Sequence, residues 1–518
     1  MNLSLLNTPL RFRLLLLTLA VGAGGQAFAA KEKMNVLFIA VDDLNDWTGL
    51  LEGHPQAYTP NLDRLAKRGI YFTNAHCAAP VCTTSRQSLL SGLAPTTSGW
   101  VNNIPKSAAE YDQVLAGRNP LPTHFRENGY VTLAAGKIYH RGVQDFDYPL
   151  WDETLPSRYG FNKEVPGYRS SHFNPFPPDG GAIFQANGGR VKGDTLCWAA
   201  LEKDEMPKKG MPDEQIAAWA VEQLDEKYEK PFFLAVGFLR PHNPFTAPAS
   251  YFDRYPLESI KVPEIPENEF NDIPLYGKAM AYGTLPKGDH AEVLAISSTY
   301  WQELVRAYLA CTTFVDDQIG KVLDALDESP YADNTIIVLW SDNGQHLGEK
   351  RHWRKQALWE ESTRVPLFIS VPGLATDGEL RDQPVSLLDI FPTLSELCDL
   401  PEQELDGVSL VPMLKNDAVE RGAPVVTTRY HGNHAVRSQH WRYIRYRDGS
   451  EELYDHRTDP GEHVNLVSNP ECAEVLKSHR KWLLENEGAG DATADFPRDT
   501  YDRRVDQFEK EGVPDWLK

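Results

Sequence analysis

Four apolar segments of this chain are each followed by polar side chains of kinds that carry out chemistry. The segments cover residues 35–41, 131–135, 232–238 and 335–340. The side chains that follow them are, in order, Asp42 with Asp43, Lys137 with His140, His242, and Asp342 with Asn343. Carboxylate and amide oxygens suit a hard divalent cation, while lysine and histidine suit anion binding and proton transfer. The pattern predicts one site to which four segments contribute.

The strands that would position these side chains are predicted by the apolar runs themselves. Near-continuous apolar strands indicate a sheet buried on both faces, and such sheets are mostly parallel with helical crossovers. Residues 301–326 have apolar positions at steps of three or four, which predicts a helix directly before the strand at 335–340. Because ligand sites in such sheets lie beyond the carboxyl ends of the strands, we expect the polar side chains to converge at one edge. For Asp42 and Asp43 alone, the alternative is a helix cap.

Length and charge narrow the class of protein. The chain has 518 residues, enough for two or three domains and a sizeable core. Lysine and arginine together number 52 against 73 aspartate and glutamate, and the net charge of −21 argues against a general nucleic-acid binder. The six cysteines match no zinc-binding pattern, and the sequence does not assign their pairing. The composition is that of a globular enzyme.

The first 29 residues have the layout of a signal peptide. Arg11 and Arg13 precede an apolar run at 14–21, and residues 27–29 read Ala-Phe-Ala, a small-residue cleavage site. The apolar run is shorter than the ~20 residues that span a bilayer. We therefore expect cleavage after Ala29 and a periplasmic or secreted protein without membrane attachment, with a retained N-terminal anchor as the alternative.

Two domains are expected after this segment. Residues 30–432 form the larger one, in which the stretch 141–230 is rich in glycine and proline and predicts long loops that shape a binding site. Residues 433–518 alternate short polar and aromatic stretches around Asp448-Gly449, which predicts a small antiparallel sheet with a hairpin turn, closed by a helix at 473–486. The expected fold class is α/β with a large, mostly parallel central sheet, plus a small C-terminal α+β subdomain.

One further motif carries a family resemblance. Residues 80–92 read P-V-C-T-T-S-R-Q-S-L-L-S-G, and they resemble the C-x-P-S-R signature of the type I, formylglycine-dependent sulfatases. Other blocks resemble the same family in the same order, at residues 41–43, 59–66, 136–140, 231–242, 341–349 and 452–466. Within the family the likeness is greatest to iduronate-2-sulfatase-like enzymes, although Asn343 stands where those enzymes tend to carry histidine.

The resemblance implies an alkaline-phosphatase-like fold, with residues 30–432 as the sulfatase catalytic domain. It implies that Cys82 is oxidised to formylglycine, the nucleophile, by a formylglycine-generating or sulfatase-maturating enzyme. It also implies one calcium ion, and the residues that match its ligands are Asp42, Asp43, Cys82 as formylglycine, Asp342 and Asn343. Thr84 departs from the family, which has proline or alanine there, so conversion of Cys82 requires an enzyme that accepts threonine.

The resemblance also assigns the cationic side chains. Arg86 matches the residue that orients the formylglycine and the metal, and Lys137 with His140 matches the pair that contacts the hydroxyls and the sulfate. His242 and Lys355 match the sulfate-binding and leaving-group side. An acid must protonate the leaving alcohol, and His242 is the first choice for that role, with His140 as the second.

These assignments imply an exported hydrolase that removes a sulfate ester from a sulfated glycan containing a uronic acid or a similar sugar. Residues 350–355 hold four cations, which we interpret as a basic funnel for the glycan, with a solvated loop as the alternative. Two other functions stay open. One is a formylglycine-dependent phosphoesterase or phosphonate hydrolase, and the other is a catalytically inactive sulfated-glycan-binding protein with an unmodified Cys82.

Overall fold

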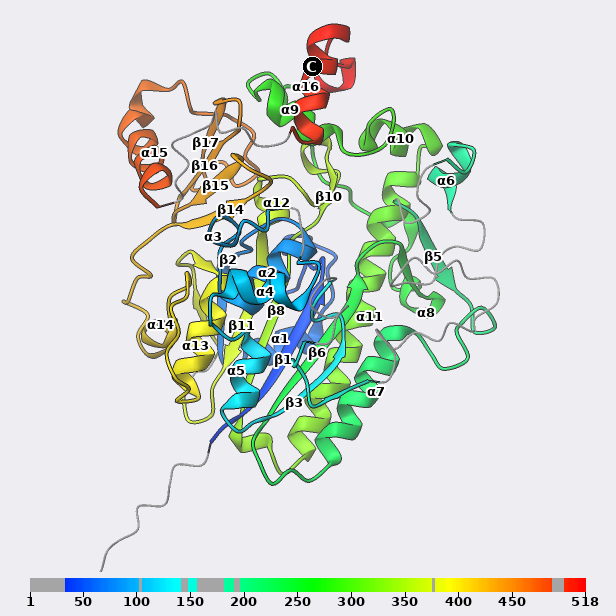
Figure 1. Cartoon of the computed structure of the whole chain (residues 1–518). Helices are drawn as coiled ribbons and strands as arrows, with labels where there is room; N and C mark the ends of the chain where they lie inside the picture. The colour runs from blue at the N-terminus through cyan, green and yellow to red at the C-terminus, as the bar shows by residue number, and fades with distance from the viewer. Residues whose placement is uncertain are drawn as a thin grey trace, which may run out of the picture. The chain divides into compact units, whose positions relative to one another are not determined.

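A central nine-stranded sheet carries the polar side chains that were expected to converge (Figure 1). Along the sheet the strands follow the order β12, β2, β11, β8, β1, β6, β3 and β4, and β13 also pairs with β2. Their bounds are β1 (Asn35–Asp42), β2 (Ile70–His76), β3 (Val131–Gly136), β4 (Glu153–Thr154), β6 (Phe232–Pro241), β8 (Thr335–Ser341), β11 (Arg364–Ser370), β12 (Glu379–Arg381) and β13 (Val385–Ser386). The computed structural model describes residues 33–101, 105–140, 148–155, 181–190, 196–374, 378–486 and 498–518, and element counts refer to these.

Two of the sequence predictions concern residues outside that description. The signal peptide at 1–29 lies outside it entirely, and so does much of the loop region at 141–230. Residues 34–518 form one compact unit, and the arrangement given below is that of this unit. Among the described helices, none combines the length and the apolar character needed to cross a membrane.

The four strands that lead to the candidate site are neighbours in the sheet. β8, β1, β6 and β3 run parallel to one another, with Val36 of β1 paired to Phe233 on one side and to Ile336 on the other. Every residue of β1 is buried, as expected for a strand that is covered on both faces. β11 runs antiparallel to both β8 and β2. The sheet is therefore mixed at one side but mostly parallel, which confirms the expected fold class.

Helices and short strands complete the fold. The helices are α1 (Pro60–Ala66), α2 (Cys82–Ser91), α3 (Pro95–Ser98), α4 (Ala108–Leu115), α5 (Leu121–Glu127), α6 (Ala182–Ala186), α7 (Pro212–Asp225), α8 (Ala249–Phe252), α9 (Leu275–Tyr282), α10 (Asp289–Ile296), α11 (Tyr300–Glu328), α12 (Glu360–Thr363), α13 (Ile390–Leu397), α14 (Val411–Lys415), α15 (Ala473–Asn486) and α16 (Thr500–Glu511). Two further strand pairs are β5 (Trp198–Leu201) with β7 (Phe245–Pro248), and β9 (His346–Leu347) with β10 (Trp353–Arg354). β10 leads directly into Lys355.

The helices form two layers because successive side chains of β1 point to opposite faces of the sheet. Val36 and Phe38 pack in one core with residues of α2, α5 and α13. Leu37 and Ile39 pack in a second core with residues of α7 and α11. Figure 1 shows α5 and α13 on one side of the sheet and α7 and α11 on the other. α11 confirms the helix that was predicted at 301–326.

The C-terminal part contains the predicted antiparallel sheet. Its strands pair in sequence order as β14 (Val425–Thr428), β15 (His434–Arg437), β16 (Trp441–Arg445) and β17 (Glu451–Asp455). Gly449 lies in the turn between the last two strands with a φ of +85°, a conformation that glycine adopts easily. α15 packs on this sheet through Leu476 and Leu483 and confirms the helix expected at 473–486. The sheet begins at β14 and so starts before residue 433. The domain boundary between residues 432 and 433 stays a prediction.

Candidate active site

The carboxyl ends of β1 and β8 bring three acidic side chains together. The backbone N–H of Asp43 donates to Asp342 Oδ1 at 3.1 Å, so the two strand ends are joined directly. Asp43 has a φ of +61°, in the left-handed region that few non-glycine residues adopt. Its Oδ1 accepts a hydrogen bond from Asn343 Nδ2 at 2.9 Å. The turn after β1 is therefore held in place by the residues that follow β8.

Cys82 begins α2 and points toward these carboxylates. Its Sγ lies 3.7 Å from Asp43 Oδ1 and 2.7 Å from Lys355 Nζ, and the residue is 3% exposed. Burial raises the pKa of the Cys82 thiol, although Lys137 and Lys355 act to lower it. The first residue of a helix also lies in the positive end of the helix dipole. Position 82 is thus a buried place, beside a lysine and several carboxylates, for a nucleophile or a metal ligand.

Arg86 lies one helical turn after Cys82 and connects three of the strand ends. Its Nε donates to Asp342 Oδ2 at 2.7 Å, and its Nη2 donates to Asp42 Oδ1 at 3.2 Å. Its Nη1 donates to the backbone carbonyl of Lys137. The side chain is fully buried, and a planar guanidinium is well suited to holding several oxygens in fixed positions. Arg86 fixes the relative placement of the acidic residues.

The carboxylates of Asp42 and Asp43 stay ionised inside the protein. Burial raises the pKa of Asp42, but the charges of Lys137, whose Nζ contacts Asp42 Oδ2, of His242 and of Arg86 together outweigh burial and hold that pKa below its usual range. Burial also raises the pKa of Asp43, and the charges of Lys355, His242 and Lys137 together outweigh it there. The cluster therefore keeps its acidic oxygens available to a cation.

Both predicted histidines lie at this edge. The Nε2 of His242 faces Asp43 Oδ2 at 3.7 Å, and its Nδ1 contacts the carbonyl of Asn243. Burial lowers the pKa of His242, and the negative charge of Asp43 partly opposes this. Burial also lowers the pKa of His140, where the nearby charges of Lys137 and Lys355 act in the same direction. The structure therefore brings both histidines close to the cations of the site.

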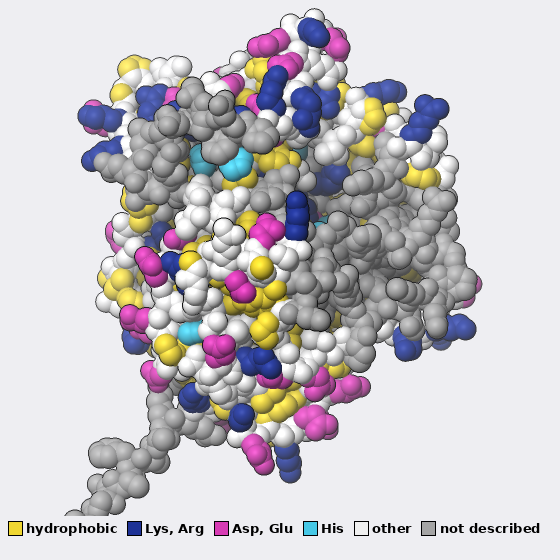
Figure 2. Space-filling model, in the orientation of Figure 1, with side chains coloured by type: hydrophobic (Ala, Val, Ile, Leu, Met, Phe, Trp, Pro, Cys, Tyr) yellow, Lys and Arg dark blue, Asp and Glu magenta, His cyan; other side chains and the backbone are white. Residues whose placement is uncertain are grey.

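The basic run at 350–355 does not form the funnel that the sequence suggested. Lys355 reaches Cys82 and Asp43. Three neighbouring cations are used elsewhere: Lys350 pairs with Glu269, Arg351 binds the carbonyl of Trp516, and Arg354 pairs with Asp289. Glu269 and Asp289 are buried carboxylates that need positive partners. On the face drawn in Figure 2, the described acidic and basic side chains are interspersed.

The arrangement fits a hard divalent cation. One ligand atom each from Asp42, Asp43, Cys82 and Asp342 lie within 4.8 Å of one another, and all four residues are buried. Within the described part of the chain, Asp43 Oδ2 and Asn343 Oδ1 are buried atoms that make no hydrogen bond. Buried oxygens of this kind are costly unless something binds them. Since nearly all of these donors are oxygens, the set matches calcium chemistry.

The sequence did not reveal a residue of α11 that supports this site. The hydroxyl of Tyr308 donates to the backbone carbonyl of Asp43 at 2.8 Å and accepts from the N–H of Asn45 at 3.0 Å. Tyr308 therefore helps to hold Asp43 in its left-handed conformation. In the sequence it falls on the apolar stripe of the helix, so only its hydroxyl group distinguishes it from a core residue.

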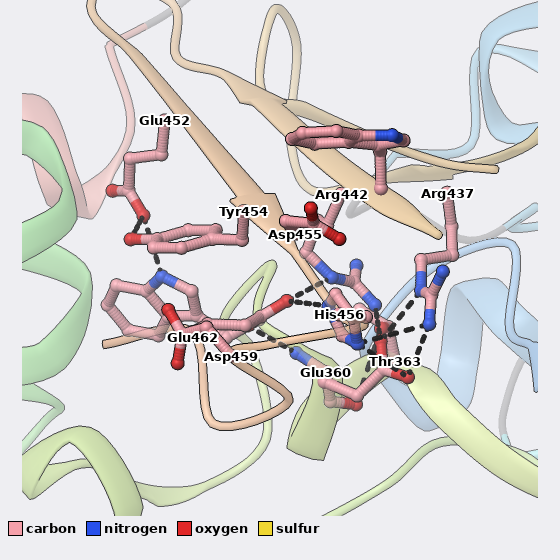
Figure 3. A network of polar contacts seen from close by, with 12 residues as sticks. Glu360, Thr363, Arg437, Arg442, Glu452, Tyr454, Asp455, His456, Asp459 and Glu462 are labelled. Carbon is pink, nitrogen blue, oxygen red and sulfur yellow. Dashed lines mark hydrogen bonds and ion pairs between the residues drawn. The ribbon is translucent and has the colours of Figure 1, made fainter. Parts of the chain in front are cut away.

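A second buried group of potential ligands was also absent from the sequence predictions. Glu360, His456 and Glu462 bring one ligand atom each within 4.8 Å of one another. Arg442 ion-pairs with both glutamates, and Arg437 Nε lies 3.2 Å from Glu360 Oε2 (Figure 3). The network joins α12 to the antiparallel sheet, and its positive charge is supplied by the protein itself.

Comparison with known proteins assigns the chain to a family. Residues 34–400 match the Sulfatase family, and residues 348–488 match the C-terminal family of N-sulphoglucosamine sulphohydrolase. A protein named Sulfatase from Formosa agariphila is 39% identical over 479 residues, which cover 91% of this chain and 90% of that protein. Iduronate 2-sulfatase of Homo sapiens is 30% identical over 419 residues, 76% of this chain and 70% of that protein.

Solved structures agree with this assignment at the level of the fold. The structure of a 2-O GAG sulfatase is 23% identical to this chain, with a TM-score of 0.67. The superposition covers 92% of this chain and 96% of that chain. The chain belongs to the sulfatase family, the sulfuric ester hydrolases, and has their alkaline-phosphatase-like fold.

Proposed function

We propose that this chain is an exported sulfatase that uses a formylglycine at position 82 and one calcium ion to hydrolyse a sulfate ester of a sulfated glycan. The observation that supports this best is the position of Cys82, which starts a helix between Lys355 and the buried carboxylates. The names of the human relative and of the GAG sulfatase structure support a glycan with a uronic acid or a similar sugar as the substrate.

The chain's own residues account for binding and orientation. Asp42, Asp43, Asp342 and Asn343, with position 82, would hold the calcium ion. When bound, calcium supplies charge that polarises a sulfate oxygen, and formylglycine supplies the attacking hydroxyl. Arg86 keeps the carboxylates in place through its three strand-end contacts. These contacts are made by the chain's own residues, and fixed groups of this kind are what electrostatic preorganisation requires.

Cationic and histidine side chains would bind the sulfate and release the alcohol. Lys355, which contacts Cys82 Sγ, would bind the sulfate oxygens together with Lys137 and His140. His242 would protonate the leaving oxygen from Nε2. Its Nδ1 contact with the Asn243 carbonyl fixes the ring so that Nε2 faces the site. A positioned acid of this kind typically contributes about 10²- to 10⁴-fold to the rate.

The test is a mass spectrum of the tryptic peptide 69–86, from protein made in its native host, together with an assay of sulfate release. An aldehyde at position 82 with release of sulfate from an ester is the expected result. An intact thiol with affinity for sulfated glycans and no turnover would favour the binding-protein alternative. An aldehyde with a preference for phosphate or phosphonate esters over sulfate esters would favour the other hydrolase class.

Export and maturation are parts of the same proposal. The signal-peptide pattern at 1–29 supports export to the periplasm or the medium, and sequencing the N-terminus of the mature protein should place it after Ala29. A formylglycine-generating or sulfatase-maturating enzyme would act on Cys82. Replacing Thr84 with proline or alanine, as the family signature has it, should leave the extent of conversion unchanged or raise it.

A further inference from the structure

The backbone around Lys355 has an unusual conformation. Arg354 and Gln356, the residues on either side of it, have φ angles of +70° and +83°. Both lie in the left-handed region, which residues with a Cβ rarely adopt. Conformations of this kind persist where the surrounding structure holds them, and they are common at functional sites. The segment that presents Lys355 is therefore held by its neighbours.

Some of those neighbours are close in the chain or in the site. A ring nitrogen of His352 lies 3.1 Å from the carbonyl oxygen of Lys355. The N–H of Gln356 donates to the carbonyl of Pro80 at 3.0 Å. Pro80 lies in the segment that leads into Cys82, so the backbone bond ties the lysine segment to the nucleophile segment.

The other neighbours come from the C-terminal end of the chain. The hydroxyl of Tyr501, in the first turn of α16, donates to the carbonyl of Gln356 at 2.8 Å. Arg429 Nη2 donates to Gln356 Oε1 at 2.8 Å, and its guanidinium lies over the ring of Tyr430. Tyr501 is 6% exposed, and residues 498–518 lie outside both matched family regions.

α16 is itself firmly placed. Asp499 caps its first turn by accepting from the N–H of Tyr501 at 2.7 Å, and the Tyr276 hydroxyl of α9 donates to the same carboxylate at 3.1 Å. Tyr282 and Phe508 join α9 and α16 in one apolar core. Figure 1 shows α16 beside α9, close to β10. Tyr501 therefore has a fixed position from which to hold Gln356.

We propose that Tyr501 is a positioning residue for Lys355, and that α16 thereby completes the active site from the far end of the chain. The inference rests on the proposed role of Lys355 in binding the sulfate. Tyr501 acts through the Gln356 carbonyl and does not touch Cys82. Thr500 and Tyr501 also line a small pocket together with Lys355 and Gln356, so α16 borders the space beside the lysine.

The experiment is a double-mutant cycle with Tyr501→Phe and Lys355→Ala in the full-length mature protein. Each variant is measured for kcat/KM with a sulfate ester, for inhibition by inorganic sulfate, for formylglycine content and for Tm. Tyr501→Phe should lower kcat/KM about tenfold, because a misplacement of about 1 Å can cost about 100-fold and a smaller displacement of Lys355 costs less. It should also weaken inhibition by sulfate. In the Lys355→Ala background it should have no further effect, since its action passes through the lysine.

Tyr443→Phe is the matched control. It also removes the hydroxyl of a buried tyrosine, but that hydroxyl contacts Glu451 in the antiparallel sheet and not the start of α16 or Gln356. Its kcat/KM should stay within about twofold of the wild type. Gln356→Gly is a second variant for the case in which Tyr501→Phe unfolds. Glycine adopts a φ of +83° without strain, so this variant should fold while kcat/KM falls, because its backbone is free to move.

Several results would overturn the inference. Independent, multiplicative losses from Tyr501→Phe and Lys355→Ala would show that α16 merely stabilises the fold, as would an equal loss in Tyr443→Phe. The kcat/KM values of the wild type and of Lys355→Ala with a sulfate ester test the proposed function independently of Tyr501. If the wild type does not turn over, the same cycle read through inorganic sulfate affinity still decides the positioning role. A wild type that neither hydrolyses sulfate esters nor binds inorganic sulfate would refute both proposals.

Discussion

The cluster around Cys82 and the network around Glu360 are both buried, and both bring acidic side chains within 4.8 Å of one another. They differ in the cations that face them. Two arginines, with their planar forks, pair with Glu360 and Glu462. Around Cys82 an arginine, Arg86, likewise pairs with Asp42 and Asp342, but the other two cations paired with the carboxylates are lysines. Asp43 Oδ2 and Asn343 Oδ1 make no hydrogen bond within the described chain. Proximity of carboxylates therefore does not by itself define a metal site. Whether a cation can bind depends on which groups of the protein already pair with those carboxylates.

The largest expected effect concerns the nucleophile position. Cys82→Ala should lower sulfate ester hydrolysis by roughly 10⁴-fold or more, because loss of a covalent nucleophile has effects of that order. Sulfate release under saturating substrate measures this. Cys472→Ala, another buried thiol in the C-terminal part, should keep its activity. Comparable losses in both variants would mean that Cys82 matters through packing.

The next largest effect is expected in the network around Glu360. Glu462→Gln should lower the free energy of unfolding by about 3 kcal/mol, because the buried Arg442 loses a charged partner. Urea titration measures this, and calcium titration should still show one bound ion. If the variant lost calcium binding instead, the Glu360 network would be the metal site.

The same variant has a defined pH dependence. Burial raises the pKa of Glu462, but Arg442 and His456 outweigh burial, so its pKa in the folded protein lies below the ordinary value of 4.5. A lowered pKa gives stability that is present at neutral pH and is lost as the pH falls through the folded pKa. The difference in stability between wild type and Glu462→Gln should therefore shrink below about pH 4.5.

The smallest expected effect concerns Tyr308. Tyr308→Phe removes the hydroxyl that binds the Asp43 carbonyl, which should weaken calcium binding by about fivefold, or about 1 kcal/mol. Isothermal titration with calcium measures it. Tyr443→Phe removes a hydroxyl that contacts Glu451, far from the site in the chain, and should leave calcium affinity unchanged. Equal weakening in both variants would contradict the role of Tyr308.

The sequence predicted that these side chains meet at one edge of the sheet, because the residues follow local patterns. Asp42, Lys137, His242 and Asp342 each come directly after a buried strand, and parallel neighbouring strands must end at the same edge. The antiparallel sheet and α15 were predicted on similar local grounds. The orientation of β11 was not, because an apolar run gives no direction.

Long-range partners explain what the sequence did not predict. The cations at 350–355 look like a solvated or substrate-binding run until Glu269 and Asp289, distant in the chain, are seen to pair with two of them. The contact of Tyr501 with Gln356 is of the same kind. Such pairs depend on how elements far apart in sequence pack, which periodicity and motif spacing do not encode.

The burial of Cys82 also limits when during synthesis and folding another enzyme could reach its thiol. The residue is 3% exposed in the folded chain, beneath strand ends that include those of β8, which is made long after Cys82 during synthesis. In the proposed maturation, the modifying enzyme would have to reach this thiol before β8 joins the sheet. The sequence around Cys82 would then be recognised first by that enzyme as an extended chain, and would be enclosed by the fold only later.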